Sequence, residues 1–208
     1  MLVMIKIHEL PDMGPFTQHA HRLNDGDHLV HFYEDKFTLI DSVSEYIVPS
    51  ITRGEGIIII ATAENRNIFN AVLERRAIDV TMAKATGQLQ IFDAADTLKK
   101  FMSNGVPNPI KFRETIGRVI EKMQEKFPRV RAYGEMVNLL WHDDNIEATI
   151  QLEHLWNELT HHYDFSLFCG YAMNENQKQK KGVKFNEICC SHTHVISHSG
   201  DLKMIELA

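Results

Sequence analysis

The stretch that decides the fold is Gly56-Ile57-Ile58-Ile59-Ile60-Ala61-Thr62. Neighbouring side chains of a strand point to opposite faces, so four consecutive isoleucines leave neither face polar. A strand that is apolar on both faces is typical of a parallel sheet covered by helices on both sides. The sequence therefore predicts an α/β protein in which this segment is a buried strand.

Outward from this strand, short apolar runs alternate with runs whose apolar residues recur at helical spacing. We predict further strands at residues 28–34, 88–92, 130–133, 165–171 and 192–196. Helices are expected between them, for example one that begins after Asp35 and ends at Gly54. Strands separated by helices form right-handed βαβ units. The expected architecture is therefore a mostly parallel central sheet with helices on both faces.

Capping residues predict two further helix starts. Asp93 precedes a short apolar helix, and Asn108-Pro109 supplies a cap followed by a first-turn proline. A stretch rich in glutamine, asparagine and lysine at residues 173–184 predicts a polar loop. At 208 residues the chain fits a single large domain. We expect a loosely structured arm over residues 1–27, one domain over 28–200, and a tail over 201–208 that could pair with a second subunit.

Composition restricts the partners and the compartment. The formal net charge of −6 argues against direct nucleic-acid binding through overall charge. No apolar run reaches the roughly 18 residues of a membrane span, so no membrane partner is expected. The three cysteines include an adjacent pair, Cys189 and Cys190, which is poor spacing for a disulfide framework. These features favour a reducing, cytoplasmic environment.

The sequence lacks the loop with which such sheets usually bind phosphate. Neither Gly-x-x-x-x-Gly-Lys-Ser/Thr nor Gly-x-Gly-x-x-Gly occurs. The first strand of the domain runs instead into Phe32-Tyr33-Glu34-Asp35, where two carboxylates would repel a phosphate. No nucleophile elbow is present either. We therefore expect no nucleotide hydrolysis, and we predict no bound cofactor and no catalytic residue.

Three polar residues are candidates for a binding site. Glu135 follows a predicted strand at the edge where ligands of open α/β sheets bind, and it could equally cap a helix. Glu153 and Asn157 are four apart and share one helix face. They either bond to a neighbouring loop at the edge of the core or face the same cavity as Glu135.

The segment Cys189-Cys190-Ser191-His192-Thr193-His194 contains soft metal-ligand types. On a strand, His192 and His194 would point to the same side. With Cys190 they form a weak candidate for a transition-metal site, because no Cys-x-x-Cys or helical His-x-x-x-His pair accompanies them. Cys169 lies inside an apolar strand and is interpreted as an inert core residue.

Together these segments resemble the MEDS domain, the methanogen/methylotroph DcmR-type sensory domain. The resemblance covers roughly residues 25–198. Its most specific pieces are Gly-Glu-Met-Val-x-Leu-Leu-Trp at 134–141 and Leu-Glu-x-Leu-Trp-Asn-x-Leu at 152–159. Further matching pieces are His31-Phe32-Tyr33-Glu34-Asp35, residues 56–62, residues 93–98 with Phe101-Met102, residues 165–171, and Ile188-Cys189 with residues 192–195.

The resemblance implies a RecA/KaiC-like fold without the Walker A phosphate loop and a regulatory role. Such domains are proposed to sense small organic or hydrocarbon-type molecules. We therefore expect a stand-alone sensory domain that binds a small ligand and signals to a signalling or transcription-regulating protein. The alternatives are a degenerate RecA-like assembly module, which could be a homo-oligomer, and a metal-dependent enzyme that uses His192 and His194. The candidate ligand-binding residues are Tyr33, Glu34, Glu135, Trp141, Glu153, Trp156, Asn157, His192 and His194.

Overall fold

The computed structural model describes residues 12–20, 23–197 and 200–205. Its core is an eight-stranded sheet in the order β1-β10-β9-β2-β8-β7-β3-β4. Six adjacent strands are parallel: β9 (His194–Ile196), β2 (His28–Tyr33), β8 (Phe165–Ala172), β7 (Val130–Gly134), β3 (Gly56–Ala61) and β4 (Leu89–Asp93). The predicted mostly parallel sheet is therefore confirmed.

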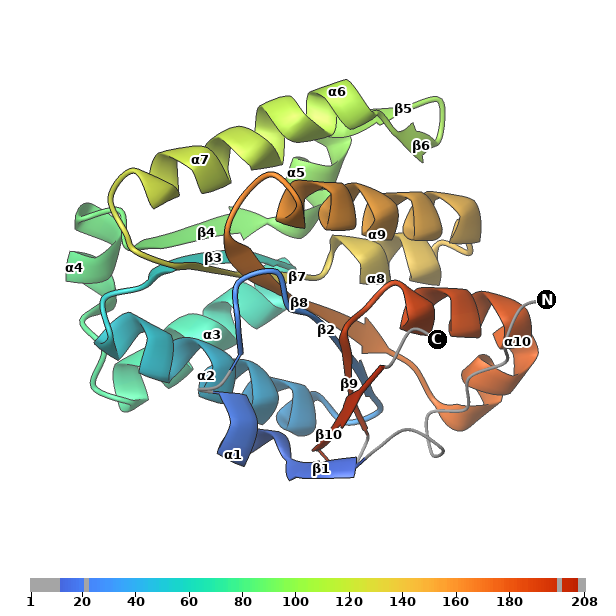
Figure 1. Cartoon of the computed structure of the whole chain (residues 1–208), viewed down its shortest axis with the longest axis horizontal. Coiled ribbons are helices and arrows are strands. Elements are labelled where there is room, and N and C mark those ends of the chain that lie inside the picture. The colour runs from blue at the N-terminus through green and yellow to red at the C-terminus, as the bar shows by residue number, and fades with distance from the viewer. Residues whose placement is uncertain (1–11, 21–22, 198–199, 206–208) are drawn as a thin grey trace.

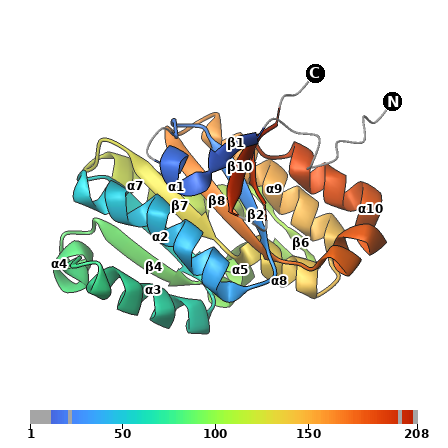
Figure 2. The ribbon, with the colours of Figure 1, turned by 90° about the horizontal axis from the view of Figure 1, so that it is seen from below.

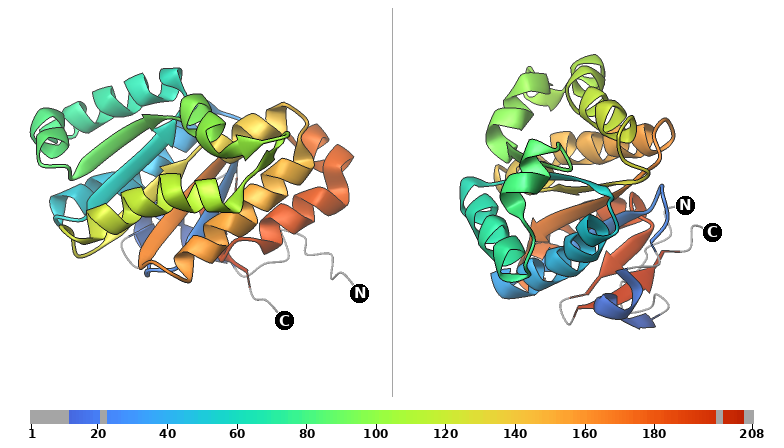
Figure 3. Two further views of the ribbon diagram at one scale, coloured as in Figure 1. Left: turned by 90° about the horizontal axis from the view of Figure 1, so that it is seen from above. Right: turned by 90° about the vertical axis from the view of Figure 1, so that its left-hand side faces the viewer.

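Helices cover both faces of the sheet, which gives three layers (Figure 1). One face carries α1 (Phe16–His19), α2 (Lys36–Thr52), α3 (Ala63–Arg75) and α4 (Val80–Ala85), and Figure 2 shows α2 and α3 lying across it. The other carries α5 (Ala94–Phe101), α6 (Pro109–Phe112), α7 (Arg118–Gln124), α8 (Met136–His142), α9 (Ile146–Thr160) and α10 (Glu175–Cys190) (Figure 3). A short hairpin, β5 (Met102–Ser103) and β6 (Val106–Pro107), follows α5.

The isoleucines of β3 divide between the two layers as predicted. Ile58 and Ile60 pack in the core on the α9 side, whereas Ile57 and Ile59 pack in the core on the α2 side. All four are at most 1% exposed. Burying an apolar side chain of this size contributes about 1.5–3 kcal/mol, so both layers draw stability from this one strand.

Two of the predicted capping side chains form their bonds. Asp93 accepts from the backbone N–H of Asp96 at 2.9 Å, and Asn108 accepts from that of Lys111 at 3.0 Å. Asp35 occupies the N-cap position of α2 without such a bond. The helix after Asn108 is interrupted by a π-helical turn, η3 (Arg113–Gly117), which the sequence pattern does not reveal.

The chain departs from the prediction at residues 173–184. The expected polar loop is largely helical, because α10 spans Glu175–Cys190 as two helical stretches that meet at a kink at Gly182. The polar composition concealed this helix, which is anchored at its far end by the buried Phe185, Ile188 and Cys189. The last predicted strand is correspondingly shorter, since His192 precedes β9 instead of lying in it.

Segments on both sides of the expected domain limits at residues 27 and 200 take part in the same sheet. In the expected arm, β1 (Asp12–Pro15) and α1 are ordered elements, and in the expected tail β10 (Asp201–Met204) pairs with β9. Both additions are antiparallel, and they extend one edge of the sheet. Residues 1–11 of the arm and 206–208 of the tail lie outside the described residues.

Candidate functional site

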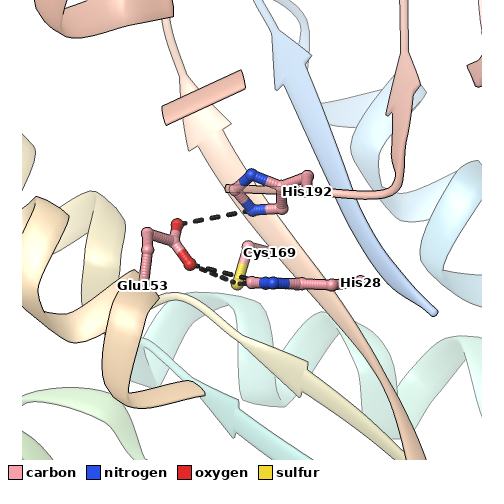
Figure 4. Close-up of side chains that lie close together, drawn as sticks. All are labelled: His28, Glu153, Cys169 and His192. Carbon is pink, nitrogen blue, oxygen red and sulfur yellow. Dashed lines mark hydrogen bonds and ion pairs between the residues drawn. The ribbon is translucent and has the colours of Figure 1, made fainter. Parts of the chain in front are cut away.

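Four buried side chains from separate parts of the chain meet against α9 (Figure 4). They are His28, Glu153, Cys169 and His192, and their ligand-type atoms all lie within 4.8 Å of one another. We call them the His–Glu–Cys–His cluster. None is more than 2% exposed, so the cluster is shielded from bulk water.

Strand register brings His28 and Cys169 together. β2 and β8 run in parallel with Val30 opposite Cys169 and His28 opposite Leu167. Because alternate residues share a face, the side chains of His28 and Cys169 both project toward α9. The His28 Nε2 atom lies 3.4 Å from the Cys169 Sγ atom and 3.4 Å from Glu153 Oε2.

Asn157 fixes the tautomer of His28. Its Nδ2–H donates to the Ser191 carbonyl at 2.8 Å, so its Oδ1 atom faces the His28 Nδ1 atom, also at 2.8 Å. An amide oxygen only accepts, and His28 Nδ1 must therefore carry the proton. This leaves a lone pair on Nε2, directed at Glu153 and Cys169. Burial lowers the pKa of His28 to about 4, so the ring is neutral at pH 7.

The second imidazole is held in the same tautomer. His192 Nδ1–H donates to the Ile188 carbonyl at the end of α10, at 2.7 Å. Its Nε2 atom lies 3.5 Å from Glu153 Oε1 and has no hydrogen-bond partner among the described residues. Burial, with the neighbouring His28, keeps the pKa of His192 well below its ordinary value. The two rings lie with their centroids 4.0 Å apart.

The Glu153 carboxyl lies between these rings. Tyr171 Oη–H donates to its Oε1 atom, and the Cys169 thiol donates to its Oε2 atom at 3.7 Å. Burial raises the pKa of Glu153 to about 8, against the lowering effect of these two donors. Burial and the adjacent Glu153 carboxyl raise the pKa of the Cys169 thiol well above its ordinary value. Both shifts favour the protonated forms of Glu153 and Cys169.

Glu135 lies on the opposite side of the sheet. Its carboxylate accepts from the backbone N–H of Thr62 at 2.7 Å, from Asn65 Nδ2 at 2.6 Å and from Tyr133 Oη at 2.8 Å. Asn65 belongs to α3 and Tyr133 packs in the core beneath α2. Glu135 therefore does not share a cavity with Glu153 and Asn157, because its carboxylate contacts α3 and Tyr133 on one side of the sheet, whereas Glu153 and Asn157 lie on α9, which covers the other side.

The remaining candidates are dispersed. Trp156 packs edge-on against Phe112 at 5.2 Å between ring centroids, and Trp141 packs edge-on against Tyr171 at 6.0 Å, both in the core. Tyr33 is buried on the α2 side, where desolvation raises its pKa, whereas Glu34 is exposed at the end of β2.

The structure separates His194 and Cys190 from His192. His194 lies in β9, and its Nδ1 atom is 2.8 Å from Thr193 Oγ1; burial lowers its pKa. His192 belongs to the turn after α10, so the two histidines do not form the expected pair along a strand. The sulfur at the site comes from Cys169, and the cluster does not include Cys190.

Sequence reasoning missed His28 and Cys169. The available signal was strand alternation: His28 shares parity with Val30 and Phe32, and Cys169 with Leu167 and Tyr171, all of which are buried on the α9 side. Only the pairing of β2 with β8 shows that the two side chains adjoin.

A small apolar cavity lies elsewhere on the α9 side of the sheet. Its volume is about 80 Å³. Its walls come from β3, β4, α5, η3 and α7, and they consist of Ile58, Ile60, Phe92, Thr97, Lys100, Thr115, Ile116 and Val119. None of the residues expected to bind a ligand lines it.

The comparisons with known proteins agree with this fold. The family described as "MEDS: MEthanogen/methylotroph, DcmR Sensory domain" matches residues 27–193. Among solved structures, a KaiC-like protein from the hyperthermophilic archaeon Pyrococcus horikoshii OT3 is similar, with a TM-score of 0.55 and 12% identity. The match covers 83% of this chain and 72% of that one, and at this identity it shows the fold alone. A search of curated proteins found no match.

Proposed function

This chain belongs to the MEDS family of sensory domains, and from that membership we propose that it binds a small, partly apolar organic molecule and signals to a partner protein. Binding would shift the population of two conformations that the partner distinguishes. The partner is a signalling or transcription-regulating protein in the cytoplasm. In support of that compartment, all three cysteines are free thiols. None of the helices in the described part of the chain has the length and apolarity to cross a membrane.

The observation that carries the proposal is the apolar cavity. Its volume of about 80 Å³ is roughly half of the 150 Å³ that admits benzene in an engineered protein cavity. It therefore suits a molecule of roughly three to four non-hydrogen atoms. Isoleucine, valine and phenylalanine walls favour an apolar body, and the hydroxyls of Thr97 and Thr115 with the Lys100 ammonium favour one polar end.

Part of the cavity wall is a backbone segment that would change its conformation when a ligand binds. Thr115 and Ile116 belong to the π-helical turn η3, between α6 and α7. Such turns contain one more residue than α-helical geometry accommodates and occur frequently at functional sites. A ligand that presses on Thr115 and Ile116 would favour one backbone arrangement of this segment over another.

We propose that the domain does not hydrolyse nucleotides. β2 ends at Tyr33 and α2 begins at Lys36, so Glu34 and Asp35 alone connect them. This connection has no glycine and carries two carboxylates, which supports the view that phosphate is not bound there.

Methyl NMR tests the proposal on four neighbouring residues of one strand. The probes are 2-propanol and acetone, with toluene as an oversized control. We expect the methyl signals of Ile58 and Ile60, which face the cavity, to shift on titration with the smaller probes. Those of Ile57 and Ile59, on the opposite face, are the internal control and should not shift.

A matched pair of variants completes the test. Val119→Phe places a ring in the cavity and should abolish the shifts, whereas Val72→Phe, a partly buried valine of α3 on the other face, should preserve them. The proposal would be contradicted if neither probe shifted the signals of Ile58 and Ile60. It would also be contradicted if the shifts persisted in Val119→Phe. Light scattering then tests the alternative of an assembly module, which predicts a stable oligomer without a ligand response.

A further inference from the structure

We propose that the His–Glu–Cys–His cluster is a binding site for a divalent transition-metal ion of the zinc type. The ligands are the Nε2 atoms of His28 and His192, the Sγ atom of Cys169 and the carboxylate of Glu153. The site is separate from the apolar cavity, and its occupancy does not depend on the sensory proposal.

Both histidines present an unprotonated nitrogen to the cluster. Hydrogen bonds to Asn157 Oδ1 and to the Ile188 carbonyl place the protons of His28 and His192 on Nδ1. The Nε2 atoms, which carry the lone pairs, lie 3.4 and 3.5 Å from the Glu153 carboxyl oxygens. A histidine that ligates a metal nearly always donates its other N–H to a carbonyl or carboxylate, which is the arrangement of both rings here.

In the part of the chain that the structure describes, one of these two Nε2 nitrogens has no hydrogen-bond donor. The Cys169 thiol lies within reach of His28 Nε2, at 3.4 Å, and of Glu153 Oε2, at 3.7 Å. The His192 Nε2 atom is fully buried and has no hydrogen-bond partner within the described chain. A buried acceptor in this state costs about 1–3 kcal/mol, and a cation would satisfy all four groups.

The separations of the ligand atoms are close to those around a zinc ion. A tetrahedral zinc ion with bonds of about 2.0–2.1 Å to nitrogen or oxygen and about 2.3 Å to sulfur holds its ligand atoms about 3.3–3.6 Å apart. His28 Nε2 lies 3.4 Å from both Cys169 Sγ and Glu153 Oε2. Cys169 Sγ lies 3.7 Å from the same oxygen, Glu153 Oε2, and His192 Nε2 lies 3.5 Å from the other one, Oε1. All four ligand atoms lie within 4.8 Å of one another, so side-chain movements that bring them closer together would coordinate the ion.

The ligand types and their summed charge also suit a zinc ion. Two imidazoles, a thiolate and a carboxylate suit zinc and similar ions, whereas calcium and magnesium prefer oxygen ligands alone. The charges of a thiolate and a carboxylate balance those of a divalent cation, so the loaded site is neutral. This matters because an uncompensated charge is costly in a buried site. The hydrogen bond from Tyr171 Oη–H would orient Glu153, and the bond between Asn157 and His28 would orient that histidine.

Elemental analysis of untagged protein, expressed in zinc-supplemented medium, tests this proposal. We expect about one zinc ion per chain, as in structural tetrahedral sites. Cys169→Ser and His192→Gln should each reduce the metal content at least tenfold. The matched controls are Cys190→Ser and His194→Gln, which remove the same residue types beside the cluster and should retain the metal. Equal losses in both pairs would overturn the assignment.

Two further measurements keep the test decisive if a ligand variant does not fold. Asn157→Leu preserves all four ligands and should weaken zinc binding about 10–100-fold in competition with a chelator. Asn138→Leu, which removes a bond to the backbone of β8 away from the cluster, should not. With Co²⁺ in place of zinc, a thiolate-to-cobalt absorption band should appear in the wild type and in Cys190→Ser. Wild-type protein that remains metal-free after refolding with Zn²⁺ would refute the site, whatever the outcome of the cavity titrations.

Discussion

The carboxylate of Glu135 accepts a hydrogen bond from the backbone N–H of Thr62 at 2.7 Å, although 73 positions separate the two residues. Thr62 is the N-cap of α3 after β3, and Glu135 is the N-cap of α8 after β7. β3 and β7 are neighbours in the sheet. The contact therefore joins two strand-to-helix junctions. With Asn65 and Tyr133 also donating to it, Glu135 has the contacts of a structural residue.

We predict that Glu135→Gln lowers the free energy of unfolding by about 1–3 kcal/mol, because the amide NH₂ would face a donor that the carboxylate now satisfies. Urea denaturation measures this loss. Metal content and the isoleucine methyl shifts should match those of the wild type at temperatures where the variant is folded. If the variant lost its metal or its methyl shifts while its stability was unchanged, Glu135 would be a binding residue and not a structural one.

A second prediction concerns the buried ion pair at the start of β3. Arg131 Nε donates to Glu55 Oε2 at 2.7 Å, and the guanidinium lies 5.2 Å from the Tyr46 ring centroid. Glu55→Gln leaves the buried Arg131 charge unpaired, and removal of one partner of such a pair typically costs about 3–5 kcal/mol. The double variant Arg131→Met with Glu55→Gln has no unpaired charge, so it should recover part of this loss, as measured by thermal unfolding. If it recovered none, the loss would not come from the unpaired Arg131 charge.

The same pair predicts a pH dependence. Burial acts to raise the pKa of Glu55, but the hydrogen bonds and charges of Arg53 and Arg131 outweigh it and hold the pKa below the ordinary 4.5. A lowered carboxyl pKa gives stability that is complete above the unfolded pKa and disappears as the pH falls through the folded one. Wild-type unfolding free energy should therefore decline below pH 4.5 more steeply than that of Glu55→Gln. Parallel acid profiles would contradict this.

A fourth prediction separates two roles of Asp93. It caps α5 through the Asp96 N–H, and it accepts from Arg66 Nη2 at 2.7 Å. Asp93→Ala should cost about 1 kcal/mol for the lost cap, and the partly exposed ion pair should add at most about 1 kcal/mol. Asp93→Asn retains an acceptor for the cap, and its smaller loss in urea denaturation reports the ion pair alone. An asparagine variant as unstable as the alanine variant would show that capping contributes little.

Gly170 provides a prediction about packing. A Cβ atom at this position of β8 would lie 3.0 Å from Tyr133 Oη and 3.1 Å from Leu39 Cδ1. Gly170→Ala should therefore destabilise the protein by about 1–3 kcal/mol. Tyr133→Phe removes the nearest atom, so the double variant should lose less than the sum of the single variants. If the losses were additive in a double-mutant cycle, the contact with Tyr133 Oη would not be the cause of the destabilisation.

Much of the fold was predictable because its signals are local. The isoleucines of β3 reveal a strand buried on both faces, and Asp93 and Asn108 mark helix starts through bonds to residues three positions away. α10 was missed because its polar first half lacks apolar periodicity, and η3 because a π-helical turn leaves no such period either. The β1 and β10 strands were missed because short antiparallel strands at a sheet edge depend on their pairing partner.

The sequence by itself determined the layered α/β architecture, the family and the absence of a phosphate loop, since these follow from periodicity and short motifs. It also supplied Glu153, Asn157 and His192 as polar candidates. Only the tertiary structure decided which of them work together. Strand order places β2 beside β8 and brings His28 to Cys169 across 141 positions, while Glu135 falls on the opposite face. Periodicity records which face a residue occupies along its own element, whereas a binding site depends on which elements become neighbours.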